Sequence, residues 1–95
     1  MNRKQKEDIV KNMVKVIEDV KKNPNSLIEE HFINPIVDVK NGETVAVCVD
    51  IWLNKGCSVR GRFLDALVRK MKTEDYFIWV ELGQIVIRFR VEEER

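Results

Sequence analysis

Apolar side chains recur every three to four positions in two stretches of the chain, and this spacing predicts two amphipathic helices. The first helix is expected over residues 4–22, with an apolar stripe made of Ile9, Val10, Met13, Val14, Ile17 and Val20. The dipeptide Asn23-Pro24 then ends it, because proline cannot continue a helix. The second helix is expected over residues 59–72, with Ser58 as its N-cap.

A shorter helix is expected between these two. The segment Ser26-Leu27-Ile28-Glu29 has the form of a capping box, in which a serine caps the helix start and a glutamate three residues later caps in return. This helix would run through Phe32 and end at Asn34-Pro35, because the residue before a proline avoids helical backbone angles.

Two strands, at about residues 36–40 and 43–53, are predicted to form a hairpin, because Asn41-Gly42 between apolar runs is typical of a tight turn. Both faces of the second strand are largely apolar, so it is expected to be a central strand of the sheet. One face consists of Val45, Val47, Val49, Ile51 and Leu53, and the other of Ala46, Cys48, Asp50 and Trp52.

The length of this hairpin loop decides which side chains pair across the two strands. A two-residue loop would place Asp38 beside Val45. A three-residue loop with Gly42 as a bulge would instead place Val37 and Val39 beside Val45. The second register is favoured because it keeps apolar side chains together.

A last hairpin is predicted over residues 76–81 and 84–91. A type I′ turn would force Leu82 to a positive φ, so a type I turn with Gly83 as a bulge is favoured. That register puts Phe77, Trp79, Ile85, Ile87 and Phe89 on one face, and Tyr76, Ile78, Val80, Val86, Arg88 and Arg90 on the other. A one-residue slip would exchange the strand partners. In either register the outer face stays apolar enough to need cover from the first helix or from another subunit.

The predicted order of elements is α-(short α)-ββ-α-ββ, which indicates an α+β two-layer sandwich with a mainly antiparallel sheet of about four strands. The 95 residues fit a single domain, residues 1–95, with one core.

Composition alone says little about partners, because the 17 lysines and arginines nearly balance the 16 aspartates and glutamates. The distribution of charge is more informative. Between residues 55 and 72 one acid, Asp65, stands against six cations, which are Lys55, Arg60, Arg62, Arg69, Lys70 and Lys72. A local charge of +5 indicates an anionic partner.

The two cysteines make no disulfide framework, and a reducing compartment is the simplest setting for them. The first residues contain no apolar segment typical of a secretory signal. The longest apolar run, residues 45–49, is far too short to span a membrane. We therefore expect a cytoplasmic protein without a membrane partner.

The loop and helix start at residues 56–62 form the most unusual part of the chain. Free backbone N–H groups and the helix dipole favour anions at a helix start, and they disfavour cations such as Arg60 and Arg62. Two explanations are open. A bound phosphate or carboxylate offsets the repulsion, or the arginines are solvated or paired with acids such as Asp65 or Glu74.

Catalysis and metal binding find little support in the sequence. The spacing from Gly56 resembles that of a phosphate-binding loop, but Arg62 and Phe63 replace its lysine and its metal-binding hydroxyl. The single histidine, His31, completes no obvious catalytic triad, and the cysteines have no metal-site spacing. Asp50 is expected to form an ion pair with a nearby arginine rather than to act as a catalytic acid.

These patterns predict a non-catalytic nucleic-acid-binding protein without a cofactor. The phosphate contacts are expected from Lys55, Arg60, Arg62 and Arg69, with Trp52 and Arg88 at the margin of the site. The alternative is a protein-interaction module or a homodimer that associates through the last hairpin. Its interface would be formed by Ile78, Val80 and Val86.

Overall fold

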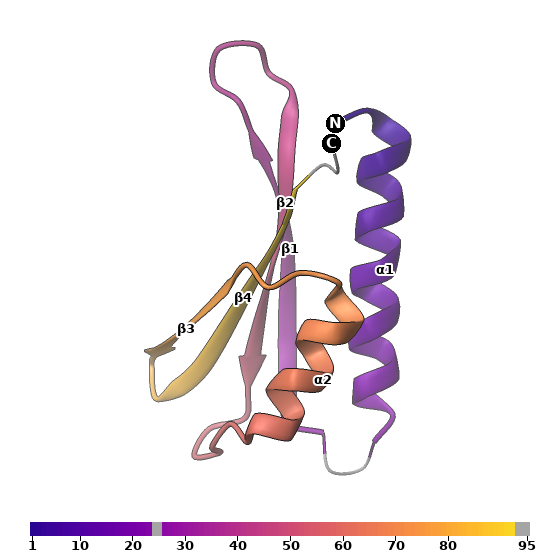
Figure 1. Ribbon diagram of the computed structural model, residues 1–95. Helices are drawn as coiled ribbons and strands as arrows, with labels where there is room; N and C mark the ends of the chain where they lie inside the picture. Colours follow the sequence, from indigo (N-terminus) through magenta and orange to yellow (C-terminus); the bar gives the residue numbers. More distant parts are fainter. Residues whose placement is uncertain (24–25, 93–95) are drawn as a thin grey trace.

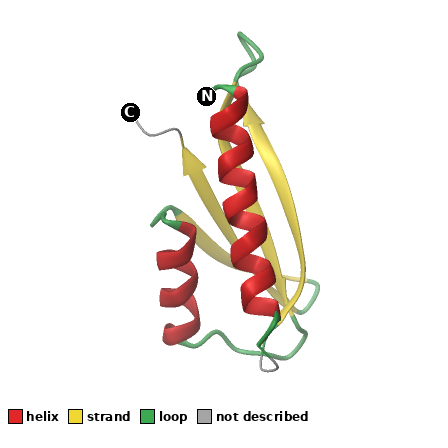
Figure 2. Ribbon diagram, turned by 90° about the vertical axis from the view of Figure 1, so that its right-hand side faces the viewer, coloured by secondary structure: helices red, strands yellow, loops and turns green. Residues whose placement is uncertain are grey.

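The computed structural model describes residues 1–23 and 26–92, which form one antiparallel sheet with two helices packed on one of its faces. Figure 1 shows both helices on the same side of the sheet, and Figure 2 shows them side by side in front of it. The strand order is β1-β2-β4-β3. The elements are α1 (Arg3–Lys21), β1 (Ile28–Val37), β2 (Thr44–Leu53), α2 (Gly61–Met71), β3 (Tyr76–Glu81) and β4 (Gln84–Glu92). The predicted α+β sandwich with about four antiparallel strands is confirmed.

Helix α1 begins with a capping box formed by residues that the apolar pattern does not include. The side chain of Asn2 accepts a hydrogen bond from the backbone of Gln5, and the side chain of Gln5 accepts one from the backbone of Asn2. Met13 and Ile17 on its apolar stripe are completely buried against the sheet. The predicted helix is therefore confirmed, with bounds that differ by one residue at each end.

The short helix and the strand at residues 36–40 were wrong predictions, because a single strand, β1, occupies residues Ile28–Val37. Ser26 does accept a local hydrogen bond, from the backbone of Ile28, but no helix follows. Pairing along almost the whole length of β2 outweighs the weak local capping signal. Pro35 is tolerated because β1 lies at the edge of the sheet.

The loop between β1 and β2 also differs from both predicted registers. It spans residues 38–43, and Asp38 closes it with backbone hydrogen bonds to Gly42 and Glu43. Val37 lies opposite Thr44 rather than beside Val45. Strand β2 is confirmed as a central strand, since it pairs with both β1 and β4.

The turn between β3 and β4 is the type I′ turn that sequence analysis disfavoured. Glu81 lies opposite Gln84, and both intervening residues have positive φ, 52° for Leu82 and 77° for Gly83. The predicted register was therefore wrong by one residue. Tyr76, Ile78 and Val80 share the helix-covered face with Ile85, Ile87 and Phe89, while Phe77 and Trp79 share the opposite face with Val86 and Arg88.

The core lies between the helices and the sheet. Side chains from both helices and from the two central strands meet there, and the fully buried ones are Met13, Ile17, Val47, Val49, Ile51, Leu53, Leu67, Met71, Ile87 and Phe89. Within residues 1–23 and 26–92, no helix packs against the opposite face of the sheet (Figure 1). We call it the open face, and it consists mainly of Glu30, Phe32, Cys48, Asp50, Trp52, Phe77, Trp79, Val86, Arg88 and Arg90.

Candidate functional site

Helix α2 begins two residues later than predicted, and Ser58 is not its N-cap. Arg60 occupies the N-cap with extended backbone angles, and no side chain caps the helix start. Cys57 and Val59 are partly buried against the core. Their packing holds the chain extended across the end of the sheet, so the helix starts only at Gly61. The packing of Cys57 and Val59 therefore explains why Arg60, which cannot cap the helix, precedes its first residue.

The cations around α2 form an exposed surface, which we call the basic surface of α2. All six of its members are exposed, namely Lys55, Arg60, Arg62, Arg69, Lys70 and Lys72. Among the described residues none of them has a carboxylate within ion-pair distance. Neither Asp65 nor Glu74 pairs with the arginines of the helix start. The charge of this surface is therefore available to an anion in solution.

One acid lies within the basic surface of α2. Arg62, Asp65 and Arg69 line a shallow hollow along the outer side of the helix. Their spacing of three and four residues puts them on one helical face. Asp65 offsets part of the charge of Arg62 and Arg69, and Lys72 at the other end of the helix lines a pocket with Asp8 and Glu92.

Trp52 and Arg88 do not belong to this surface. They lie on the open face, while α2 packs on the other face of the same sheet (Figure 1). The sheet thus separates the six residues of the predicted nucleic-acid site into four around α2 and two on the far side. The separation follows from strand alternation, because the side chains of Trp52 and Arg88 point opposite to those of Leu53 and Ile87 in the core.

The centre of the open face is an ion pair between Asp50 on β2 and Arg88 on β4. The guanidinium donates from Nε to Oδ1 at 2.6 Å and from Nη2 to Oδ2 at 2.9 Å. These hydrogen bonds raise the pKa of Arg88 above its ordinary value. The ion pair expected for Asp50 is confirmed, and it is well shielded on one side, because the Asp50 side chain is only 15% exposed.

Arg88 also lies against two aromatic rings of β3. Its Cζ atom is 5.1 Å from the centroid of the Trp79 ring and 5.7 Å from that of Phe77. The two rings are themselves 5.2 Å apart between centroids. The guanidinium is thus held by a carboxylate and by two π faces, and its orientation on the open face is fixed.

One row across the four strands of the open face consists of Phe32, Asp50, Arg88 and Phe77. The register places Phe32 opposite Asp50, Asp50 opposite Arg88, and Arg88 opposite Phe77. Phe32 is 49% exposed and Phe77 is 55% exposed, so both ends of the row present aromatic surface to solvent. Sequence analysis missed Phe32 because the capping-box pattern assigned it to a helix. Phe32 and Ile36 are an even number of positions apart, whereas Ile33 is an odd number from both. In a strand this spacing places Phe32 and Ile36 on one face and Ile33 on the other, and it is the signal that would have placed Phe32 on the open face.

The second arginine of the open face is paired as well. Arg90 contacts Glu92 through Nη2 at 3.1 Å and lies 4.0 Å from Asp75 through Nε. It neighbours Cys48, whose pKa is raised by burial although Arg88 and Arg90 act in the opposite direction. The open face therefore carries neutralised arginines, in contrast to the basic surface of α2.

The predicted oligomer interface does not form one surface. Ile78 and Val80 lie on the helix-covered side of β3, where the hairpin extends past α2, and they are 41% and 70% exposed. Val86 lies on the open face and is completely buried by its neighbours. The one-residue difference in register separates these three residues, as it exchanges all the partners of β3.

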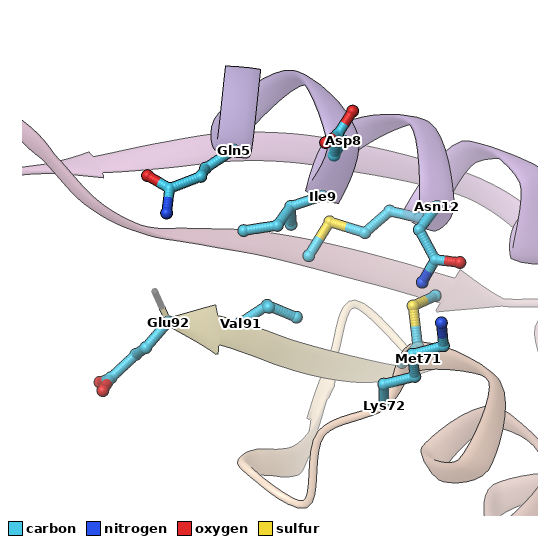
Figure 3. A pocket seen from close by; sticks show the side chains of 9 residues that line it. Gln5, Asp8, Ile9, Asn12, Met71, Lys72, Val91 and Glu92 are labelled. Carbon is cyan, nitrogen blue, oxygen red and sulfur yellow. The ribbon is translucent and has the colours of Figure 1, made fainter. Parts of the chain in front are cut away.

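A pocket of about 350 Å³ lies between α1, the end of α2 and the end of β4 (Figure 3). Its apolar lining comes from Ile9, Met13, Met71 and Val91, and its polar lining from Gln5, Asp8, Asn12, Lys72 and Glu92. Figure 3 shows that the carboxylates of Asp8 and Glu92 do not converge on a common point. These two carboxylates therefore do not form a paired acid–base site.

Within residues 1–23 and 26–92, no group of three or more histidine, cysteine, aspartate or glutamate side chains is placed to hold a metal ion. Neither helix in that part of the chain has the length and apolar character needed to cross a membrane. Comparisons with protein-family models, with curated proteins and with solved structures find no significant match to this chain.

Proposed function

We propose that this protein binds nucleic acid without catalysis, through the basic surface of α2. The observation that supports this function is the state of its six cations, which are all exposed and have no carboxylate partner among the described residues. The arginines of the open face, by contrast, are paired with acids. Unpaired charge concentrated on one side of a nearly neutral chain is typical of a polyanion-binding surface.

The shape of this surface favours contacts with a phosphate backbone over stacking on bases. Helix α2 has 11 residues and is roughly 16 Å long, enough to follow several phosphates. Trp52, the aromatic residue first expected at the margin of the site, lies across the sheet from α2. Binding should therefore depend on charge, with little preference for sequence.

A titration of a short DNA duplex at two salt concentrations tests this proposal. With about four phosphate contacts, the affinity should fall on the order of 100-fold between about 50 and 200 mM salt. The double variant Arg62→Glu/Arg69→Glu should lose most of its affinity. Its fold should persist, because both positions are exposed and a glutamate in the first turn suits the helix dipole.

The matched control is Lys11→Glu/Lys15→Glu, which makes the same change in net charge at exposed positions of α1. Its affinity should fall much less than that of the α2 variant, because Lys11 and Lys15 lie outside the basic surface of α2. Equal losses in the two variants would refute a localised site. Absence of binding at low salt, or binding that does not respond to salt, would refute the proposed function itself.

A further inference from the structure

The open face is an unpartnered surface with exposed aromatic side chains. Phe32 and Phe77 are each about half exposed, and Trp52 and Trp79 lie partly exposed in the adjacent row. Both helices cover the opposite side of the sheet (Figures 1 and 2). Several exposed aromatic side chains on one sheet face of a small domain are typical of an interface.

We propose that two copies of this chain associate face to face through their open faces, about a two-fold axis that runs along the strands between β2 and β4. The contacts across this axis involve the row formed by Phe32, Asp50, Arg88 and Phe77. A two-fold axis parallel to the strands reverses the order of the strands in the second copy. Phe32 then faces Phe77 of the second copy, and Asp50 faces Arg88 of the second copy.

Charge complementarity within this row, between Asp50 and Arg88, is what selects a second copy as the partner. In this arrangement each Asp50 carboxylate lies between its own Arg88 and that of the second copy, so four charges alternate in sign across the axis. Arg88 uses Nε and Nη2 for its own Asp50, which leaves further N–H groups of the guanidinium to donate. The two ends of the row are capped by Phe32–Phe77 contacts, which exclude water from the charges.

The spacing of packed sheets fits these contacts. Sheets that pack face to face lie about 10 Å apart, a distance that side chains from two inner faces fill by interdigitating. The small or buried residues Ala46, Cys48 and Val86 leave room between the larger side chains of the open face. The product is a four-layer sandwich with helices on both outer surfaces.

Nucleic acid is a poorer partner for this face. Its two arginines, Arg88 and Arg90, are each bound to a carboxylate, and the face carries four acids, namely Glu30, Asp50, Glu81 and Glu92. Four acids against two cations disfavour a phosphate backbone. The proposal is therefore independent of nucleic-acid binding at α2, which uses the other side of the sheet.

Sedimentation velocity over a dilution series tests the association, and two charge variants test its geometry. Phe32→Lys/Phe77→Lys and Phe32→Glu/Phe77→Glu should each raise the dimer dissociation constant roughly 100-fold or more, because like charges then face each other twice. An equimolar mixture of the two variants should dimerise again, since each lysine then faces a glutamate. Circular dichroism checks that both variants remain folded.

The matched control is Val80→Lys, a change on the other side of β3 at a position that is 70% exposed. It should leave the dissociation constant within about threefold of the unmodified protein. A wild-type chain that stays monomeric at high micromolar concentration overturns the proposal. So does a dimer that Val80→Lys dissociates while the phenylalanine variants do not, because this result places the contact at the edge of β3. Failure of the mixture to dimerise overturns the proposed contact through Phe32 and Phe77.

Discussion

At the scale of single residues, Asp50 is the acid whose environment differs most from that of an ordinary surface carboxylate. It lies on a central strand with a side chain that is 15% exposed, and it accepts two hydrogen bonds from one guanidinium. Removing these two charges from water costs free energy, which offsets much of their attraction. The effect of the pair on stability is therefore largest when one partner is removed. The remaining charge then has no compensation on a face that is largely apolar.

Replacing Asp50 by asparagine is therefore expected to lower the free energy of unfolding by about 1–3 kcal/mol. Urea denaturation at one low protein concentration measures the change, and a double-mutant cycle with Arg88→Met isolates the coupling between the two residues. The control is Arg3→Ala, which removes an exposed ion pair with Glu7 whose arginine is 90% exposed. That change should cost less than about 0.5 kcal/mol. An Asp50→Asn variant no less stable than the control would contradict a structural role for the pair.

At the scale of elements, the turn of the β3–β4 hairpin contains one residue that adopts a positive φ at a cost, Leu82, and one that adopts it freely, Gly83. Leu82 has a φ of 52°, a conformation that a branched side chain adopts at a cost, and Gly83 has a φ of 77°. The type I′ turn is retained because its twist matches that of the strands. Leu82 is 82% exposed, so packing of its side chain contributes little free energy to offset the strain of its backbone.

Leu82→Asn should stabilise the protein by about 0.5–1 kcal/mol, because asparagine tolerates the left-handed conformation and Asn-Gly suits a type I′ turn. Thermal or urea unfolding measures the gain. Gly83→Ala provides the opposite case, with an expected loss of about 1–2 kcal/mol. An added Cβ at Gly83 meets no atom within 4 Å, so that loss would come from the backbone conformation alone. If Gly83→Ala were neutral, the turn would not be of type I′.

At the scale of the whole molecule, the sheet separates two surfaces of different chemistry. The basic surface of α2 lies on the helix-covered side, and the aromatic open face lies on the other (Figure 1). In the proposed dimer the two α2 helices face away from each other. One short duplex therefore cannot reach both, and dimerisation should add no avidity for it.

The two surfaces should consequently be separable by mutation. Phe32→Ser/Phe77→Ser leaves the net charge unchanged, and we expect it to abolish self-association while keeping the affinity per subunit for a short duplex within about threefold. The reverse variant, Arg62→Glu/Arg69→Glu, should lose duplex binding and sediment like the unmodified protein. A tenfold loss of duplex affinity in the serine variant would show that the two surfaces are coupled after all.

Elements whose evidence is local could be predicted from the amino-acid pattern alone. Periodic apolar positions predict α1 and α2 because a helix buries one stripe wherever it packs, and the two apolar faces of β2 predict a central strand. Residue types alone also predicted two further features, the charge of the 55–72 segment and the pairing of Asp50 with an arginine.

Only the tertiary structure decided the strand identity of β1, the register of β3, and which candidate residues share a surface. Residues 28–37 carry a helix-start signal, but β2 offers them a partner along the strand, and no local window contains that partner. A shift of one residue in register moves every side chain of a strand to the other face of the sheet. This is why Phe77 rather than Ile78 lies on the open face. Trp52 and Arg88 are separated from the arginines of α2 because the helices cover only the other face of the sheet.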